Sequence, residues 1–110
     1  MYEYRAKYLS NYDGDTVKFR VDLGFSIHFD ITVRLSGINT HELRDANTEL
    51  REKGYVAKYR VKELLESADE IIIKTERDKK GKYGRYLAEV IYDGTNLNQQ
   101  LMDEGLAEAY

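Results

Sequence analysis

Residues 25–42 of this chain read FSIHFDITVRLSGINTHE. Between Phe25 and Leu35 every odd position is apolar and every even position is polar, which is the two-residue period of a strand with one buried face. A break near Gly24 precedes this strand and predicts a hairpin with the strand before it. The stretch therefore predicts a sheet that has one solvated face.

Polar side chains gather where this strand ends. Arg34 falls on an even position, so it is expected to point away from the apolar face. Gly37 can adopt backbone angles that other residues avoid, which leaves the chain free to turn Asn39, Thr40 and Glu42 toward the same side. These groups would then share one pocket, although an Arg and a Glu near a strand end also commonly form a surface ion pair.

Similar patterns place the other elements along the chain. We expect five strands, at residues 2–12, 17–23, 25–35, 71–75 and 83–92. We expect helices over residues 54–68 and from Leu97 to just before Gly105, with a loop or frayed helix start over residues 43–53. This order predicts an α+β fold, mainly β: a five-stranded OB-fold-like barrel with two helices packed on it. An open α+β sheet is the alternative.

Composition narrows the class of protein. The 110 residues are expected to form a single domain, residues 1–110, with 42% hydrophobic and 34% charged residues. A membrane partner is not expected, because no apolar run reaches about 18 residues. The absence of cysteine excludes disulfides and thiolate metal sites. The first residues lack the apolar core of a secretion signal, so the chain is cytoplasmic or a trimmed secreted protein, and its localisation stays open.

Three separated stretches carry anionic oxygens or guanidinium groups at turns: residues 13–16 (DGDT), residues 34–42 and residues 83–85 (YGR). Each is weak alone, because an Asp-Gly pair is a hairpin signal first. Together and in this order they resemble the staphylococcal nuclease (thermonuclease) family, and the likeness runs from Tyr12 to about Ala107. The fold of that family, a five-stranded barrel with helices, agrees with the prediction from periodicity.

The resemblance implies a calcium site. Asp15 matches one ligand, Asn39 stands at the position of a second, and Thr40 offers its backbone carbonyl. An all-oxygen set without His or Cys suits calcium or magnesium better than zinc. The family has an aspartate where this chain has Asn39, so we expect weaker calcium affinity rather than a lost site. The family's proline is His41 here, an imidazole expected to be inert unless it reaches a phosphate.

The resemblance also implies catalytic and phosphate-binding groups. Glu42 matches the glutamate that positions or activates the attacking water, while Arg34 and Arg85 match the arginines that grip the scissile phosphate. Lys82 and Tyr83 match residues that contact a neighbouring terminal phosphate. A planar guanidinium suits this chemistry, because it donates two parallel hydrogen bonds to phosphate oxygens and stays protonated.

The net charge of −3 argues weakly against a polyanionic partner, but residues 77–85 hold five basic residues and one acid. Lys79 and Lys80 in this segment are expected to contact phosphate, the alternative being a solvated hairpin tip. Tyr83, and less directly Tyr110, are candidates for stacking on bases.

The leading hypothesis is therefore a monomeric, calcium-dependent nuclease that acts on single-stranded DNA and RNA, and possibly duplex DNA, with little sequence preference. The alternative is a non-catalytic nucleic-acid-binding module of the same fold. Arg34, Glu42 and Arg85 separate the two hypotheses, because a degenerate relative would be expected to lose them. A scaffold or inhibitor has no positive feature in the sequence.

Overall fold

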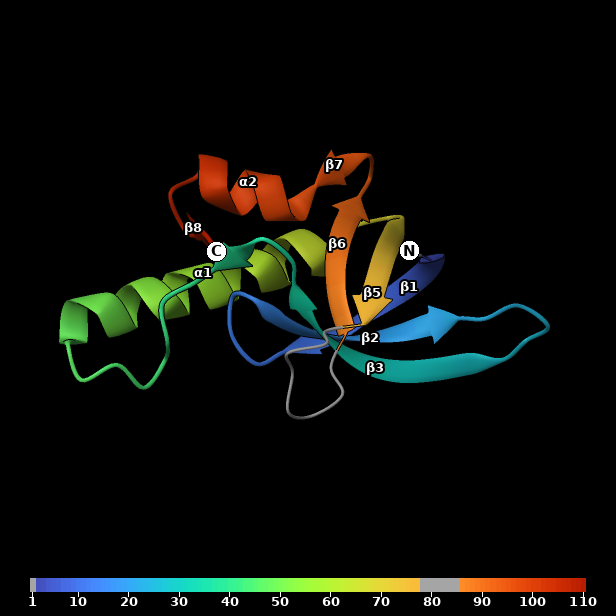
Figure 1. The fold of residues 1–110 in the computed structure, drawn as a ribbon, viewed down its shortest axis with the longest axis horizontal. Coiled ribbons are helices and arrows are strands. Elements are labelled where there is room, and N and C mark those ends of the chain that lie inside the picture. The colour runs from blue at the N-terminus through green and yellow to red at the C-terminus, as the bar shows by residue number, and fades with distance from the viewer. Residues whose placement is uncertain (1, 78–85) are drawn as a thin grey trace.

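The computed structural model describes residues 2–77 and 86–110, and Figure 1 shows their arrangement. The strands are β1 (Tyr2–Asn11), β2 (Thr16–Asp22), β3 (His28–Leu35), β4 (Ile38–Asn39), β5 (Ile71–Arg77), β6 (Tyr86–Tyr92), β7 (Thr95–Asn96) and β8 (Glu108–Ala109). The helices are α1 (Thr48–Glu66) and α2 (Leu97–Asp103). Within the described ranges, neither helix is long and apolar enough to cross a membrane.

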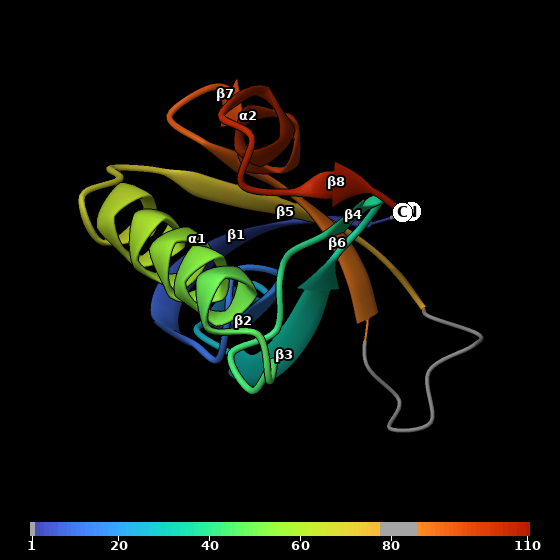
Figure 2. The same ribbon diagram turned by 90° about the vertical axis from the view of Figure 1, so that its left-hand side faces the viewer.

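Five strands close into a barrel. They run in the order β3-β2-β1-β5-β6 with antiparallel neighbours, and a parallel pairing of β3 with β6 joins the two ends. Closure confirms the predicted OB-fold-like barrel, and the open-sheet alternative is wrong. The two-stranded pair β4–β8 lies beside the barrel, below α2, where Figure 2 shows the two arrows next to each other.

Alternation along the strands fills the barrel. The inward positions of β2 are fully or almost fully buried, while Lys18 and Arg20 between them are exposed. The core draws on strands and both helices: Val17, Phe19, Val33, Leu35, Val61, Leu65, Ile73, Val90, Leu97 and Leu101. Burying a side chain of this size contributes roughly 1.5–3 kcal/mol, so the core is the main source of stability.

Helix α1 begins earlier than the sequence predicts. Residues 54–68 were expected to be helical and residues 43–53 a loop or frayed start, but the helix begins at Thr48. The Asn47 side chain caps it by accepting hydrogen bonds from the backbone N–H groups of Glu49 and Leu50. The residues of its first turns are mostly exposed, and they therefore carry no apolar period that could reveal a helix.

The β2–β3 hairpin is the second correction. All odd positions from Phe25 to Leu35 were expected on a buried face, but the strand begins at His28. Phe25, Ile27 and Phe29 are 98%, 55% and 58% exposed. The hairpin projects past the end of the barrel (Figure 1), so alternation continues in the sequence where no opposite layer exists to cover it. Its tip is a tight turn, with positive φ at Phe25.

The Asn98 side chain connects α2 to β6 and to the end of β3, the two strands whose pairing closes the barrel. Its side chain is buried, and its Nδ2 donates to the carbonyls of Ser36 (2.9 Å) and Ala88 (3.1 Å). Its Oδ1 accepts from the backbone N–H of Val90 (3.1 Å). One amide thus satisfies backbone groups just after β3 and in the middle of β6, where the parallel pairing of the two strands ends.

We therefore expect Asn98→Ala to lower the free energy of unfolding by about 2–4 kcal/mol, because it leaves buried backbone groups without partners. Urea unfolding followed by circular dichroism measures the change. The neighbouring exposed side chain supplies the control: Gln99→Ala should change stability by less than about 0.5 kcal/mol. Equal effects of the two substitutions would contradict the role assigned to Asn98.

Candidate phosphate and cation site

The turn between β1 and β2 delivers Asp15 to the base of the site. Its backbone carbonyl accepts from the N–H of Leu35 (2.8 Å), and its own N–H donates to Asp13 Oδ1 (3.0 Å). A Cβ on Gly14 would lie 2.8 Å from both Ala57 Cβ and Thr40 Cγ2. Glycine is therefore required by close packing of the turn against α1 and the loop after β4.

The carboxylate of Asp15 is the centre of the site. Asp15 is 6% exposed, and its Oδ2 accepts from the backbone N–H of Thr40 (3.1 Å). Arg34 Nη2 lies 3.8 Å from the same oxygen. Arg34 reaches this position because it pairs with Thr16, the residue after Asp15, across β2 and β3. A buried charge thus has both a hydrogen-bond donor and a cation beside it, as burial of a carboxylate requires.

Asn39 completes the cluster from β4. Its Oδ1 accepts from Arg34 Nη2 (3.1 Å), so one guanidinium nitrogen faces both the Asn39 amide and the Asp15 carboxylate. The short pairing of β4 with β8 holds Asn39 opposite Glu108. The structure therefore brings together four residues that the sequence singled out: Asp15, Arg34, Asn39 and Thr40.

Tyr110 contributes in a way that the sequence did not predict. Its backbone N–H donates to the Gly37 carbonyl (3.0 Å), and the guanidinium carbon of Arg34 lies 4.6 Å from the centre of its ring. A cation over an aromatic face is stabilised by the ring quadrupole. The sequence makes Tyr110 a candidate only for stacking on bases. Its contact with Arg34 depends on the β4–β8 pairing, which joins two-residue strands too short to show a period.

Glu42 follows the cluster in the loop between β4 and α1, and its side chain is exposed. A Cβ on Gly54 would lie 2.6 Å from the His41 carbonyl oxygen and 3.1 Å from that of Glu42. Because Gly54 has no side chain, the loop backbone packs directly against α1, and this contact fixes the position of the Glu42 backbone. The Glu42 side chain is open to solvent beside the cluster.

Five of the predicted site residues lie outside the described residues. They are Lys79, Lys80, Lys82, Tyr83 and Arg85, and their assigned roles stay predictions. β6 is described from Tyr86, so the predicted strand over residues 83–92 is observed for residues 86–92.

The Asp15 carboxyl group shares the turn with Asp13 and affects the titration of Asp13. Burial, and then the adjacent Asp15 carboxyl group, raise the pKa of Asp13 from 3.8 to about 6, although backbone N–H donors oppose the shift. The folded protein thus holds a proton on Asp13 more tightly than the unfolded chain does. A cation near this turn would favour the ionised form.

The residues present suit a hard cation by their donor type. Asp15, Asn39 and Thr40 offer carboxylate, amide and carbonyl oxygens, which are the ligands that calcium prefers. Thr40 Oγ1 is buried and has no hydrogen-bond partner among the described residues, so this hydroxyl oxygen is available to a cation or to water. The described ranges contain no cluster of three or more His, Cys, Asp or Glu side chains, so a cation here would depend on neutral oxygens and water.

The fold and the cluster together define an OB-fold-like barrel with an arginine-containing polar site at the junction of β2, β3 and β4. Comparison with known proteins identifies the family. A family model described as staphylococcal nuclease homologue matches residues 32–110. The chain belongs to this family, which confirms the resemblance predicted from the three turn motifs.

Individual relatives are similar over most of this chain. It is 37% identical over 95 residues to the SPbeta prophage-derived endonuclease YokF of Bacillus subtilis, covering 86% of this chain and 30% of that protein. It is 35% identical over 97 residues to the thermonuclease of Staphylococcus intermedius, covering 88% and 54%. A Methanocaldococcus jannaschii protein, MJ1439, is 31% identical over 128 residues, covering 97% and 59%. The chain thus spans from under a third to about three fifths of these relatives.

The raised pKa of Asp13 predicts a pH-dependent stability difference. Ionising Asp13 in the folded state costs free energy that is absent below about pH 4 and fully present above about pH 6. Asn cannot ionise, so Asp13→Asn should gain stability relative to the parent protein as pH rises. After allowance for the half-exposed position, we expect a gain of about 1 kcal/mol between pH 4.5 and pH 7.5.

Urea unfolding at both pH values, in chelator, measures this difference. Asp69→Asn is a suitable control, because Asp69 is exposed and lies between α1 and β5, outside the turn. An Asp13→Asn difference that stays the same at both pH values would show that Asp13 titrates normally in the folded protein.

Proposed function

We propose that this domain is a calcium-dependent phosphodiesterase that hydrolyses DNA and RNA with little sequence specificity. The observation that carries the proposal is the position of Arg34, whose guanidinium lies beside the Asp15 carboxylate and the Asn39 amide at one corner of the barrel. Family membership and the endonuclease and thermonuclease names of relatives support it. The proposal includes three further points: the reaction requires calcium, the substrates are both DNA and RNA, and the domain acts as a monomer.

Arg34 would bind and orient the scissile phosphate. Hydrolysis of a phosphodiester places additional charge on the phosphate oxygens, and a preplaced guanidinium stabilises that charge. The contacts with Asn39 and the Tyr110 ring limit the freedom of the Arg34 side chain. In this proposal Arg85 supplies the second guanidinium, while Lys79, Lys80, Lys82 and Tyr83 bind neighbouring phosphate groups.

Glu42 would accept a proton from the attacking water. General-base assistance of this kind contributes roughly 10²–10⁴-fold to rate. Asp15, Asn39 and the Thr40 carbonyl would hold calcium, and the chemistry that calcium supplies there when bound is Lewis acidity toward a phosphate oxygen. The Arg34 guanidinium already lies near two of these oxygens, so its charge and that of a cation would act at the same corner.

The first test is cleavage of labelled single-stranded DNA and RNA with calcium and then with chelator. We expect calcium-dependent cleavage that falls by about 100-fold or more in Glu42→Gln and in Arg34→Lys. Glu42→Gln removes the general base, and Arg34→Lys removes the planar guanidinium that donates two parallel hydrogen bonds. Arg34→Lys is preferred to Ala, since it keeps a positive charge beside buried Asp15.

Matched controls are Glu52→Gln in α1 and Arg20→Lys in β2, both exposed and outside the cluster. They should cleave at the parent rate. Cleavage that continues in chelator would contradict calcium dependence. Retention of DNA with no cleavage by any variant would support the non-catalytic binding module instead.

The second test concerns metal affinity. Asn39→Asp adds a negative charge to the ligand set, so we expect it to bind calcium at least about tenfold more tightly by calorimetry. Asn47→Asp is the control, because it adds the same charge at the N-cap of α1, where Asp and Asn are equally favourable. Equal or weaker binding by Asn39→Asp would contradict the assignment of Asn39 as a ligand.

A further inference from the structure

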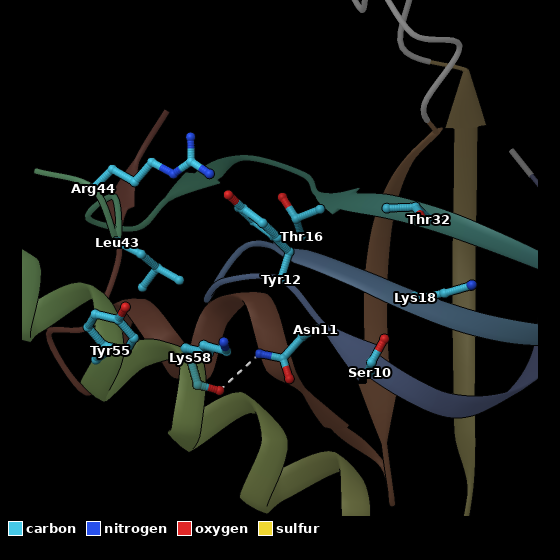
Figure 3. Close-up of a pocket in the computed structure, with 10 residues that line it drawn as sticks. All are labelled: Ser10, Asn11, Tyr12, Thr16, Lys18, Thr32, Leu43, Arg44, Tyr55 and Lys58. Carbon is cyan, nitrogen blue, oxygen red and sulfur yellow. Dashed lines mark hydrogen bonds between the residues drawn. The ribbon is translucent and has the colours of Figure 1, made fainter.

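A groove of about 460 Å³ lies beside the cluster of Asp15, Arg34, Asn39 and Thr40. Figure 3 shows that its lining comes from three parts of the chain. Lys18 and Thr32 extend from the strands, Tyr55 and Lys58 from α1, and Arg44 from the loop that joins β4 to α1. None of these five residues belongs to the predicted site.

The charge of the groove differs from that of the whole chain. Its lining, which consists of described residues, includes the cations Lys18, Arg44 and Lys58 and no carboxylate. Across the described ranges, none of the three forms an ion pair. Three unpaired cations around one hollow repel each other, and in a chain of net charge −3 this arrangement favours an anionic ligand.

The register of the sheet joins the groove to Arg34. On the outer face, Lys18 pairs with Thr32, and Thr16 pairs with Arg34 in the next outward-facing row. Thr16 also lines the groove, so the groove extends from the row of Lys18 and Thr32 to the row that carries Arg34, about 6.6 Å further along the strands. A ligand that bound the groove could therefore continue directly to Arg34.

Aromatic faces border the same groove. Tyr12 is 61% exposed and Tyr55 is 40% exposed. Bases of a single strand stack on such rings regardless of sequence, whereas paired bases in a duplex are already stacked on each other. Cations together with exposed aromatic rings favour a single strand over other polyanions.

The walls of the groove are fixed with respect to the site. Asn11 is buried, and its Nδ2 donates to the carbonyls of Lys58 (2.9 Å; dashed in Figure 3) and Asp13 (2.9 Å). One side chain thus links β1, the helix that carries Lys58 and Tyr55, and the turn that carries Asp15. The groove and the site are parts of one rigid framework.

We propose that this groove binds the backbone of single-stranded DNA or RNA next to the phosphate that Arg34 holds. Lys18, Arg44 and Lys58 contact its phosphates, and Tyr55 stacks on a base. The inference deepens the proposed function by assigning a binding surface for the flanking strand. It also holds if the domain binds nucleic acid without cleaving it.

The test measures binding of a fluorescent single-stranded 20-mer in chelator, by anisotropy at several salt concentrations. We expect Lys18→Gln/Lys58→Gln to weaken binding about tenfold or more and to reduce the slope of log K against log salt by about 1.4, or 0.7 for each phosphate contact. The matched control, Lys7→Gln/Lys62→Gln, removes the same charge from exposed positions outside the groove. Equal losses in the two double variants would overturn the proposal.

Substitutions of Tyr55 test whether the groove prefers a single strand to a duplex. Tyr55→Ala should weaken binding of the single strand about fivefold or more, while Tyr55→Phe, which keeps the ring, should leave it unchanged. Binding of a duplex of the same sequence should respond to neither. An equal loss for duplex and single strand in Tyr55→Ala would overturn the assignment to single-stranded nucleic acid.

A small phosphodiester separates this inference from the proposed enzyme activity. Hydrolysis of bis(p-nitrophenyl) phosphate needs no flanking strand, so the lysine and tyrosine variants should leave its rate unchanged while they raise KM for the 20-mer. If the parent protein cleaves neither substrate, the enzyme proposal fails, and the binding measurements still decide whether the groove holds the strand.

Discussion

The buried carboxylate of Asp15 is the constraint on which the rest of the site depends. A charge at this depth is tolerated because the Thr40 N–H and the Arg34 guanidinium face it. These two partners come from the end of β3 and from the loop beyond β4. Satisfying one carboxylate therefore fixes the turn before β2 against the end of β3 and the loop beyond β4, which lie about twenty residues or more further along the chain.

The barrel provides the framework for that contact. The parallel pairing of β3 with β6 closes the sheet near Arg34, and the buried amide of Asn98 bonds to β6 and to Ser36, directly after β3. Closure leaves the outer faces of β2 and β3 free to carry polar side chains over a packed interior. The core accordingly supplies stability, while the solvated face carries the candidate site.

The proposed action on a polyanion depends on how charge is distributed in an acidic chain. The net charge is −3, yet Arg34 and Lys18 lie in neighbouring outer rows of β2 and β3, and the other cations of the groove lie on the facing helix and the loop before it. Local potential governs the binding of an anionic strand more than total charge does. In the function proposed here, the groove retains the strand and the cluster at Asp15 acts on one of its phosphates.

The sequence by itself determined most of the strands and, through the resemblance of its turn motifs, the family and the grouping of Asp15, Arg34, Asn39 and Thr40, because alternation and turn motifs are local signals. Closure of the sheet into a barrel was decided by the parallel pairing of β3 with β6. The tertiary structure decided what depends on long-range contacts. The tip of the β2–β3 hairpin and the first turns of α1 are exposed because they extend past the barrel. The alternation of apolar and polar residues in the hairpin continues past that end, so it does not show where burial stops. Two features exist only once distant segments pack together: the contact of Tyr110 with Arg34 and the groove between the sheet and α1. No local sequence pattern can therefore predict them.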